Sequence, residues 1–390
     1  MKTKVAFFAE ILIKHYDGAS RTMFHIIGRI PKDQFEFSFF CGVPPEEQFD
    51  HPLTEVCSTK IPFNSTYSIT TPLLDIRKVW KRLDEFKPDV IHVASPSPLG
   101  NVALWYAKRN NIPTIGIYHT HFISYIDYYL QKVPLMLPPI KNQVVKGQRK
   151  FYDKFQKLYV PTTQMITELE SYGFDTSHMV LWQRGLDHTV FHPGQRDVDA
   201  LRAMTGNEKP TIIFASRLVW EKNLRTLAKI HNLIKAQGSK YNIIVAGDGV
   251  AKAELMTMMP EAIFLGSVPQ TQLALLYASC DAFIFPSVTE TYGNVVVEAM
   301  ASGCPCVIAA GGGSQSHVTS GSTGYLCQPD NADEYIQAVE RIVTDDEHKE
   351  AIIQAGIAYT KELDWDKLCN RYFTEVSEMA AGHTSVGTAV

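Results

Sequence analysis

The stretch DAFIFPSVTETYGNVVVEAMASG, residues 281–303, contains a strand, a loop and a helix in succession. DAFIFPS is a short apolar run of the kind that forms a buried strand. NVVVEAMASG has the apolar content of a packed helix, and it stops at Gly303, just before Pro305. A strand that leads into a helix through a short polar loop is the repeating unit of a parallel α/β sheet.

The same alternation of strand and helix recurs in both halves of the chain. The runs that we expect to form strands are KVAFFAE, FEFSFFCG, DVIHVASP, TIGIYHT, KLYVPT and MVLWQRG in the first half, and TIIFASR, NIIVAGDG, AIFLGSV, AFIFPS, PCVIAA and GYLCQP in the second. Amphipathic segments that favour helices lie between many of these runs. Two such series predict an α/β protein with two Rossmann-like domains.

We assign residues 1–195 to an N-terminal Rossmann-like domain that binds the acceptor, and residues 205–363 to a C-terminal domain that binds a nucleotide sugar. HPGQRDVDALRAMTGNEKP, residues 192–210, is rich in charge, glycine and proline and is the expected linker. Residues 364–390 are expected to form a C-terminal helix that packs back on the N-terminal domain.

Composition narrows the class of protein. The chain is 45% hydrophobic and 20% charged with a net charge of −4, as in an ordinary soluble protein, and gives no reason to expect a nucleic-acid partner. Its seven cysteines are scattered, which favours reduced thiols. The apolar run VAFFA is closed by Glu10, too early for a signal peptide, and no apolar run approaches the ~18 residues of a membrane span. We expect a cytoplasmic protein.

Two carboxylates flank the loop in the opening stretch. Ligands bind beyond the carboxyl ends of parallel strands, where Glu290 lies. Tyr292, Gly293 and Asn294 lead into the first turn of the helix, whose free N–H groups suit a diphosphate. Glu298, about one turn further, could reach hydroxyl groups of the same ligand. This pattern fits a nucleotide sugar; the alternative is that both glutamates are ordinary loop and surface-helix charges.

Two cations follow another strand of the second half. ASRLVWEKNL, residues 215–224, places Arg217 and Lys222 at the carboxyl end of the run TIIFASR. Paired cations stabilise a nucleoside diphosphate as it leaves, because negative charge accumulates on it. The Walker A pattern of P-loop enzymes is absent. A solvated arginine or lysine remains the alternative for either residue alone.

Three glycine-rich turns also follow expected strands. They contain Gly18 in YDGAS, Gly247 in AGDGV, and the glycines of AAGGGSQS, residues 309–316. Glycine permits a close approach of backbone to a phosphate, but each turn alone could be a plain tight turn. AGDGVAK lacks the third glycine of the dinucleotide fingerprint, which disfavours an oxidoreductase.

A histidine pair lies at the end of another strand. In GIYHTHFISY, residues 116–125, His119 and His121 have the spacing that points two rings to the same face. No third ligand of convincing spacing lies nearby, so we expect no metal. One histidine could contact the sugar, or both could be core or loop residues. The Asp-x-Asp pairs at 197/199 and 364/366 are interpreted as incidental.

These motifs together resemble the retaining glycosyltransferases of family 4. That family has the GT-B fold, in which two Rossmann-like domains have parallel sheets that face each other across a cleft. The resemblance rests on the E-x7-E element from Glu290 to Glu298, on SRLVWEKN, and on RGLDHTVFHP, residues 184–193. YHTHFISY resembles the members that glycosylate lipids, including those that transfer mannose or sulfoquinovose.

The resemblance implies a metal-independent enzyme without a cofactor. It would move a hexose from a GDP-mannose or UDP-glucose type of donor to a lipid or glycan acceptor, with retention of configuration. The implied catalytic residues are His119, Arg217, Lys222 and Glu290. The implied donor contacts are Gly18, Arg217, Lys222, Gly247, Val268, Glu290, Thr291, Tyr292, Gly293, Asn294 and Glu298. His121 and Tyr125 are the candidate acceptor contacts.

The chain departs from the family pattern at two positions. Asp17 precedes Gly18 where the family has a glycine pair, and His121 replaces the aspartate of many lipid-acting members. The remaining alternatives are a non-hydrolysing nucleotide-sugar epimerase and a non-catalytic protein that binds sugar nucleotides.

A basic segment suggests how a lipid acceptor could be reached. LQKVPLMLPPIKNQVVKGQRKFYDKFQK, residues 130–157, combines apolar residues with seven basic residues and one acidic residue. Such a segment suits the surface of an anionic bilayer, which would place the protein at the inner face of the plasma membrane. The alternative is a charged helix packed on its own domain.

Overall fold

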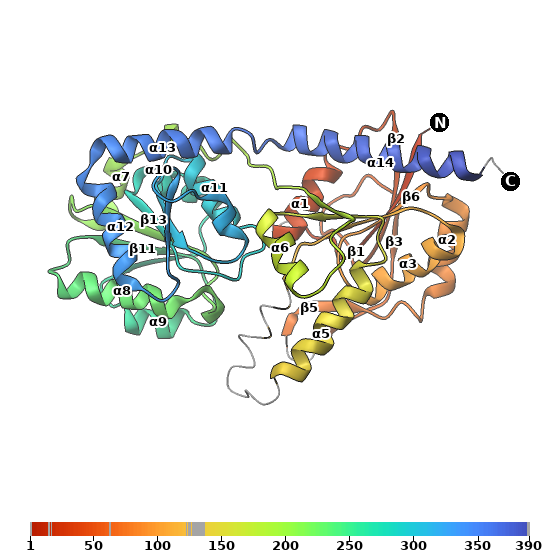
Figure 1. The fold of residues 1–390 in the computed structure, drawn as a ribbon, viewed down its shortest axis with the longest axis horizontal. Helices are drawn as coiled ribbons and strands as arrows, with labels where there is room; N and C mark the ends of the chain where they lie inside the picture. Colours follow the sequence, from red (N-terminus) through yellow and green to blue (C-terminus); the bar gives the residue numbers. More distant parts are fainter. Residues whose placement is uncertain are drawn as a thin grey trace. The chain divides into compact units, whose positions relative to one another are not determined.

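The computed structural model describes residues 2–14, 16, 18–61, 64–121, 123, 126 and 137–387. The chain divides into two compact units. The first comprises Met1–Pro161, Ile166–Gln183 and Trp365–Val390, and the second comprises Thr162–Met165 and Arg184–Asp364. Figure 1 shows both units as α/β structures.

The first unit is built on a seven-stranded sheet. Its strands are β1 (Thr3–Ile11), β2 (Phe35–Val43), β3 (Leu53–Glu55), β6 (Val90–Val93), β7 (Thr114–Ile117), β8 (Lys157–Val160) and β9 (Met179–Leu181). They are all parallel, in the order β3-β2-β1-β6-β7-β8-β9. An antiparallel hairpin of β4 (Ser58–Ile61) and β5 (Asn64–Thr70) accompanies the sheet. The central strands β6, β7 and β8 are almost entirely buried, as expected for a sheet covered by helices.

The helices of the described first half are α1 (Gly18–Ile27), α2 (Ile76–Phe86), α3 (Pro98–Asn110), α5 (Leu137–Tyr152) and α6 (Thr163–Ser171). Helix α3 begins where Ser97 accepts a hydrogen bond from the backbone of Gly100, with Pro98 in the first turn. It ends at Asn111, which adopts the left-handed conformation.

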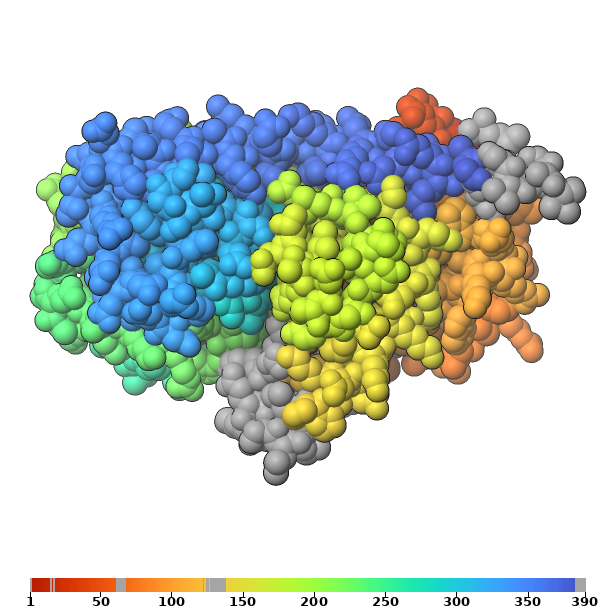
Figure 2. Space-filling view, in the orientation of Figure 1, coloured from red at the N-terminus to blue at the C-terminus, as the bar shows by residue number. Residues whose placement is uncertain are grey.

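The first unit is completed by α14 (Trp365–Gly387), which follows the whole of the second unit in sequence. Trp365, Cys369, Tyr372 and Val376 lie at helical spacing and are buried in the core of the first unit. The opposite face of α14, in deep blue, lies on the molecular surface in Figure 2.

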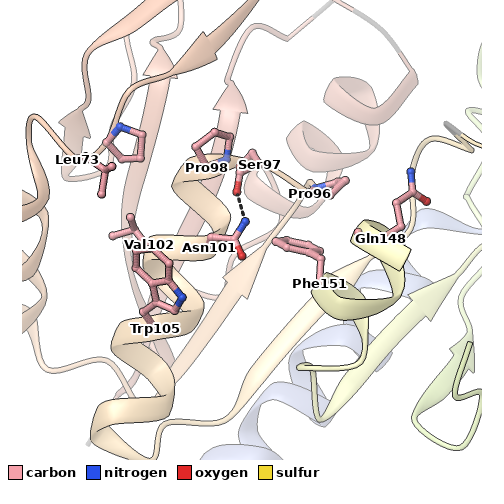
Figure 3. Close-up of a pocket in the computed structure, with 11 residues that line it drawn as sticks. Leu73, Pro96, Ser97, Pro98, Asn101, Val102, Trp105, Gln148 and Phe151 are labelled. Carbon is pink, nitrogen blue, oxygen red and sulfur yellow. Dashed lines mark hydrogen bonds between the residues drawn. The ribbon is translucent and has the colours of Figure 1, made fainter. Parts of the chain in front are cut away.

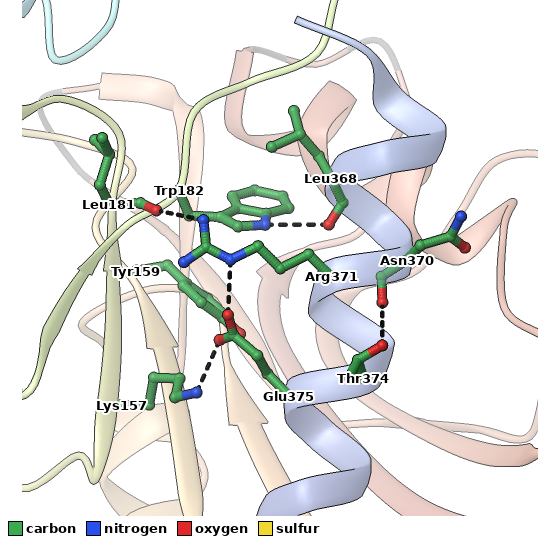
Figure 4. Close-up of polar contacts among 9 residues, drawn as sticks. All are labelled: Lys157, Tyr159, Leu181, Trp182, Leu368, Asn370, Arg371, Thr374 and Glu375. Carbon is green, nitrogen blue, oxygen red and sulfur yellow. Dashed lines mark hydrogen bonds and ion pairs between the residues drawn. The ribbon is translucent and has the colours of Figure 1, made fainter. Parts of the chain in front are cut away.

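Polar contacts fix α14 in place. Tyr372 Oη lies 2.8 Å from Nδ1 of the buried His92 on β6. Glu375 accepts hydrogen bonds from Lys157 Nζ at 2.8 Å, Tyr159 Oη at 2.6 Å and Arg371 Nε at 2.7 Å (Figure 4). These contacts join two strand residues to the helix.

The second unit is built on a six-stranded parallel sheet. Its strands are β10 (Thr211–Ala215), β11 (Asn242–Ala246), β12 (Ile263–Gly266), β13 (Ala282–Phe285), β14 (Cys306–Ala309) and β15 (Gly324–Cys327). Their order is β12-β11-β10-β13-β14-β15. The two sheets confirm the predicted α/β class, and every run predicted as a strand contains one.

Helices lie on both sides of the second sheet in Figure 1. The α-helices are α7 (Val198–Thr205), α8 (Leu224–Ala236), α9 (Lys252–Met258), α10 (Gln270–Ser279), α11 (Asn294–Ala301), α12 (Ala332–Thr344) and α13 (Asp346–Thr360). Three 3₁₀ helices are η1 (Pro193–Gln195), η2 (Trp220–Lys222) and η3 (Gly313–His317).

The expected linker at 192–210 lies within the second unit, and the chain passes between the units at 161/162, 165/166, 183/184 and 364/365. The linker segment is ordered because Asp197 caps α7 by accepting a hydrogen bond from the backbone of Ala200. Leu201 on this helix is buried in the core of the second unit. The charge content of the segment therefore reflects a surface helix.

None of the described helices is long and apolar enough to cross a membrane.

Candidate active site

The order of strands in the second unit reverses between β10 and β13. These strands are neighbours, with Ile212 opposite Ala282. Arg217 follows β10 directly, and Glu290 follows β13. Ligands of open α/β sheets bind beyond the carboxyl ends of the strands at such a reversal. The structure thus brings two of the predicted site residues to the expected edge of the sheet.

Lys222 and Glu290 form a close ion pair at this edge. Lys222 Nζ donates to Glu290 Oε1 at 2.6 Å and to Thr289 Oγ1 at 3.2 Å. The side chain of Lys222 is 4% exposed and that of Glu290 is 24% exposed. Removing one member of such a pair leaves a poorly solvated charge without its counter-charge, so the two are energetically coupled.

The backbone around Lys222 is held by the neighbouring asparagine. Asn223 ends η2 in the left-handed conformation, with a φ of 55°, and α8 begins directly after it. Its side-chain amide donates to the carbonyl oxygens of Pro286 at 3.3 Å and Pro329 at 2.9 Å. The lysine therefore projects from a short helix that is anchored to the loops after β13 and β15.

Arg217 contributes a second cation with greater exposure. Its side chain is 60% exposed, and Nη2 lies 3.6 Å from Glu221 Oε1. The pKa of Glu290 lies below its ordinary value: burial opposes ionisation, but the charge and hydrogen bond of Lys222 outweigh it, and Arg217 and Arg184 act in the same direction. Glu290 is therefore a carboxylate at neutral pH.

The loop after Glu290 is shaped for close backbone packing. Gly293 has a φ of 85° and precedes α11, and a Cβ there would lie 2.6 Å from Cβ of Ser314. Gly313 donates its N–H to the carbonyl of Glu290 at 2.6 Å. Thr291 and Tyr292 are buried, and Asn294 begins α11. The glycines of the segment 309–316 thus accommodate the loop that carries Glu290.

Sequence reasoning missed a buried network behind this loop. His317 Nε2 donates to the carbonyl of Tyr292 at 2.7 Å, and Nδ1 accepts from Tyr359 Oη at 2.8 Å. Burial lowers the pKa of His317 to about 4, so the ring is neutral. Tyr292 Oη in turn donates to the carbonyl of Arg184 at 2.8 Å. The network fixes the backbone that leads into α11.

Comparisons with known families agree with this geometry. A model described as Glycosyltransferase Family 4 matches residues 16–190, and one described as Glycosyl transferases group 1 matches residues 197–359. Together they cover most of the chain.

The chain belongs to glycosyltransferase family 4.

Individual relatives extend the family match. This glycosyltransferase is 28% identical over 387 residues to a GDP-mannose-dependent alpha-mannosyltransferase of Corynebacterium glutamicum, covering 97% of this chain and 89% of the relative. It is 31% identical over 297 residues to the sulfoquinovosyl transferase SQD2 of Arabidopsis thaliana, covering 74% of this chain and 56% of that protein. The epimerase alternative gains no support from these relatives.

Solved structures show the same GT-B fold. Anabaena Alr3699/HepE in complex with UDP and glucose matches with a TM-score of 0.73 and 19% identity, over 96% of this chain and 99% of that one. Sucrose-phosphate synthase from Thermosynechococcus elongatus matches with a TM-score of 0.75 and 16% identity, over 98% and 100% of the two chains.

The other predicted donor residues of the transferase lie in the same unit. Glu298 is buried on α11, and its charge contributes, after burial, to the raised pKa of Tyr277. Gly247 follows β11 with a φ of 141°, and a Cβ there would lie 1.8 Å from the carbonyl oxygen of Ser216. Backbone packing alone therefore requires this glycine. Val268 follows β12 and is half-buried against the core. Direct contacts of these residues with a donor stay predictions.

The predicted residues of the first unit follow β1 and β7. Gly18 is the first residue of α1, and its carbonyl accepts from Thr22 Oγ1 at 2.9 Å. His119 is 7% exposed and His121 is 3% exposed. Asp17 and Tyr125 lie outside the described residues.

His121 occupies a defined hydrogen-bond chain. Its Nδ1 lies 2.7 Å from Tyr118 Oη, and its Nε2 lies 2.9 Å from Glu168 Oε1. The hydrogen bond from His121 is the main cause of the lowered pKa of the Glu168 carboxyl. Both ring nitrogens thus have protein partners, which favours a role in fixing the loop after β7 over direct contact with an acceptor.

Proposed function

We propose that this glycosyltransferase transfers a hexose from a nucleotide-diphosphate sugar to a lipid acceptor, with retention at the anomeric carbon. The observation that carries the proposal is the ion pair of Lys222 and Glu290 at the strand reversal of the second unit. The names of the relatives favour GDP-mannose as the first donor to test. The monoglucosyldiacylglycerol synthase of Streptococcus pneumoniae, 28% identical over 234 residues, favours a lipid acceptor.

The cations of the site suit the leaving group. When the bond between the anomeric carbon and the diphosphate breaks, negative charge develops on the terminal phosphate. Lys222 offers a fixed positive charge, since its side chain is only 4% exposed. Arg217 offers a more mobile one, since its side chain is 60% exposed. The N-terminus of α11 adds N–H groups at the same end of the sheet. These groups support metal-independent departure of the nucleotide.

The carboxylates suit the two ends of the donor. Glu290 is ionised and partly exposed, so it can accept hydrogen bonds from sugar hydroxyls while it remains paired with Lys222. Glu298, further along α11, is assigned to the ribose. In the proposed reaction the acceptor oxygen attacks from the face that the diphosphate leaves, and its proton passes to the leaving phosphate. No side-chain nucleophile is required.

The acceptor side of the reaction is assigned to the first unit. His119 and His121 follow β7 there. His119 is proposed to contact the sugar being transferred, and His121 to set the local hydrogen bonding, since it bridges Tyr118 and Glu168. Tyr125 stays a candidate acceptor contact.

Donor binding tests the proposal directly. Thermal unfolding is measured with GDP-mannose, UDP-glucose, GDP and UDP, each with and without EDTA. We expect the ligands of one base, guanine or uracil, to raise the melting temperature, because a bound ligand stabilises the folded state. EDTA should not change this increase. Products from lipid extracts are then identified by mass spectrometry, and NMR gives their anomeric configuration. Stabilisation by none of the four nucleotides, or an inverted product, would refute the proposal.

A non-catalytic sugar-nucleotide-binding protein makes a different prediction. It would be stabilised by the donor without releasing nucleotide in the presence of any lipid extract. Measuring released GDP or UDP under the same conditions distinguishes this alternative from the enzyme.

A further inference from the structure

A groove opens on the first unit between α3, α5 and the turn that precedes α2 (Figure 3). Its volume is about 490 Å³, within the range of ~300–1,000 Å³ typical of small-ligand sites. The lining residues include Leu73, Val102, Trp105, Gly147, Gln148 and Phe151. Most of them are apolar, so the groove suits a hydrocarbon.

Large apolar side chains extend from this groove into solvent. Trp105 is 51% exposed, Leu73 is 68% exposed, and its neighbour Leu74 is 78% exposed. Single exposed apolar residues are common, but a group of them beside an apolar groove indicates an interaction surface.

A buried polar group gives the groove a second chemical feature. Gln148 is 7% exposed, and among the residues that the structure describes its Oε1 has no hydrogen-bond partner. The other polar lining groups are engaged: Ser97 Oγ accepts from Gly100, and Asn101 Oδ1 accepts from Lys154 Nζ at 3.0 Å. A buried acceptor without a donor is costly, so the occupant of the groove should supply a hydroxyl or an N–H to Gln148.

Lys154, which donates to Asn101 of the groove lining, has two other lysines nearby. The pKa of Lys154 is lowered, first by burial and then by the charges of Lys150 and Lys108. In the part of the chain that the structure describes, none of the three has an ion pair with a carboxylate. Their mutual repulsion would be relieved by an anionic group at this position.

The groove lies at the functional edge of its sheet. Pro96 and Ser97 follow β6, and β6 pairs with β7, which leads to His119. The order of strands in the first sheet reverses between β1 and β6. The groove therefore begins where an open α/β sheet binds ligands.

We propose that the groove binds the hydrocarbon chain of an anionic membrane glycerolipid. In this arrangement Leu73, Leu74 and Trp105 enter the bilayer, the three lysines contact the anionic headgroup, and Gln148 accepts from a lipid hydroxyl. The inference deepens the proposed function, on whose lipid acceptor it rests, because it names the surface by which the enzyme reaches that acceptor.

This surface differs from the basic segment 130–157 taken as a whole. Lys141 lies over the ring of Tyr172 at 5.2 Å, and Lys157 pairs with Glu375 at 2.8 Å. These two basic residues contact their own unit. Lys132 lies outside the described residues.

Filling the groove tests the proposal with a matched control. A Cβ at Gly147 would meet no atom within 4 Å, so Gly147→Phe places a ring in the groove without a backbone clash, and Gly147→Ala is the control. Both changes favour the helix, which keeps the fold intact. With phosphatidylglycerol vesicles in a sedimentation assay, we expect the phenylalanine variant to bind about tenfold more weakly and the alanine variant to match wild type.

The insertion of Trp105 into the bilayer and the contribution of the lysines are measured in separate experiments. Phosphatidylglycerol with brominated acyl chains should quench the fluorescence of wild type, and Trp105→Phe should lose most of that quenching. Lys108→Gln and Lys150→Gln should each weaken binding about fivefold to phosphatidylglycerol and leave binding to phosphatidylcholine unchanged.

The outcomes separate this inference from the proposed function. GDP and UDP binding of every groove variant is measured by thermal shift and should equal that of wild type. If Gly147→Phe binds vesicles as wild type does, or if bromine does not quench Trp105, the groove is not the lipid site. If wild type binds lipid as described but no nucleotide stabilises it, the donor proposal fails while the lipid site stands.

Discussion

The two sheets of this enzyme place different chemistry at their strand reversals. In the second unit, the reversal between β10 and β13 carries a closely paired lysine and glutamate, with an arginine nearby. In the first unit, the reversal between β1 and β6 is followed by a proline-rich turn, a capped helix and an apolar groove. A diphosphate needs a few oriented charges, whereas a hydrocarbon needs contact area. Under the two proposals, the same topology serves two kinds of ligand.

The largest effect should come from removing the cation of the second unit. Lys222→Met leaves Glu290 without its ion-pair partner and removes the least exposed cation of the site. We expect kcat/KM to fall about a thousandfold, in line with the loss of a preorganised electrostatic contact. Steady-state kinetics measure the effect, with the exposed Lys229→Met on α8 as the control.

A double variant sharpens that prediction. Adding Glu290→Gln to Lys222→Met removes the unpaired carboxylate, so part of the lost stability should return while activity stays low. Additive losses of stability would show that the pair is not coupled. Vesicle binding through the first unit should be unaffected in Lys222→Met, in Glu290→Gln and in the double variant.

Low pH should reduce the folding stability of both units, because each contains a buried neutral histidine. Burial lowers the pKa of His317 to about 4 and of His92 to about 3. Between these values and the unfolded pKa of about 6.5, the unfolded state binds more protons, so stability falls as pH decreases from 6.5 to 4. For His317 the shift corresponds to about 3 kcal/mol.

Denaturant unfolding across this pH range measures the slope. His317→Gln removes the buried imidazole of the second unit, so the free energy of unfolding should depend less steeply on pH. The contribution of His92 to that slope should persist. A slope that His317→Gln leaves unchanged would contradict the assignment of a neutral buried imidazole.

His317 should also affect turnover through the loop that it holds. His317→Phe removes the donor to the carbonyl of Tyr292, and we expect kcat to fall about tenfold because the loop before α11 loses a fixed contact. His317→Gln, which keeps an N–H donor, should recover part of this loss. Equal loss in both variants would indicate a purely structural role in the core.

The smallest expected effect on the donor site concerns changes in α14. Glu375→Gln weakens the contacts with Lys157, Tyr159 and Arg371, and should lower the free energy of unfolding by about 2 kcal/mol. Nucleotide binding by the second unit should not change. A lowered affinity for GDP or UDP would show that the helix influences the donor site.

Much of the fold could be predicted because strands buried on both faces are continuous apolar runs. The runs before Arg217 and Glu290 were recognisable in this way, and the position of both residues at one sheet edge followed from the topology. The hairpin of β4 and β5 was not predicted, since its strands are short and mixed in composition. Helix α7 was missed because charge obscured its cap and its buried Leu201.

The supporting residues of the site were harder to predict. His317 acts on a backbone carbonyl 25 residues earlier, and no spacing rule connects the two. The glycine-rich turn in the segment 309–316 is visible in the sequence. Its close packing on the loop of Glu290 depends on tertiary contacts and is not. Neither the positive φ of Gly293 nor its approach to Ser314 could be anticipated, because a residue that precedes a helix usually has an extended backbone.

The return of α14 to the first unit has a consequence for how the protein is made. Tyr372 and Val376 belong to the core of a unit whose residues outside 365–390 all precede residue 184, where the main part of the second unit begins. The first unit therefore waits for the entire second unit to be translated before its own core can close. An N-terminal fragment released at the unit boundary would expose the strand surface that α14 covers, and it should be a substrate for chaperones and proteases.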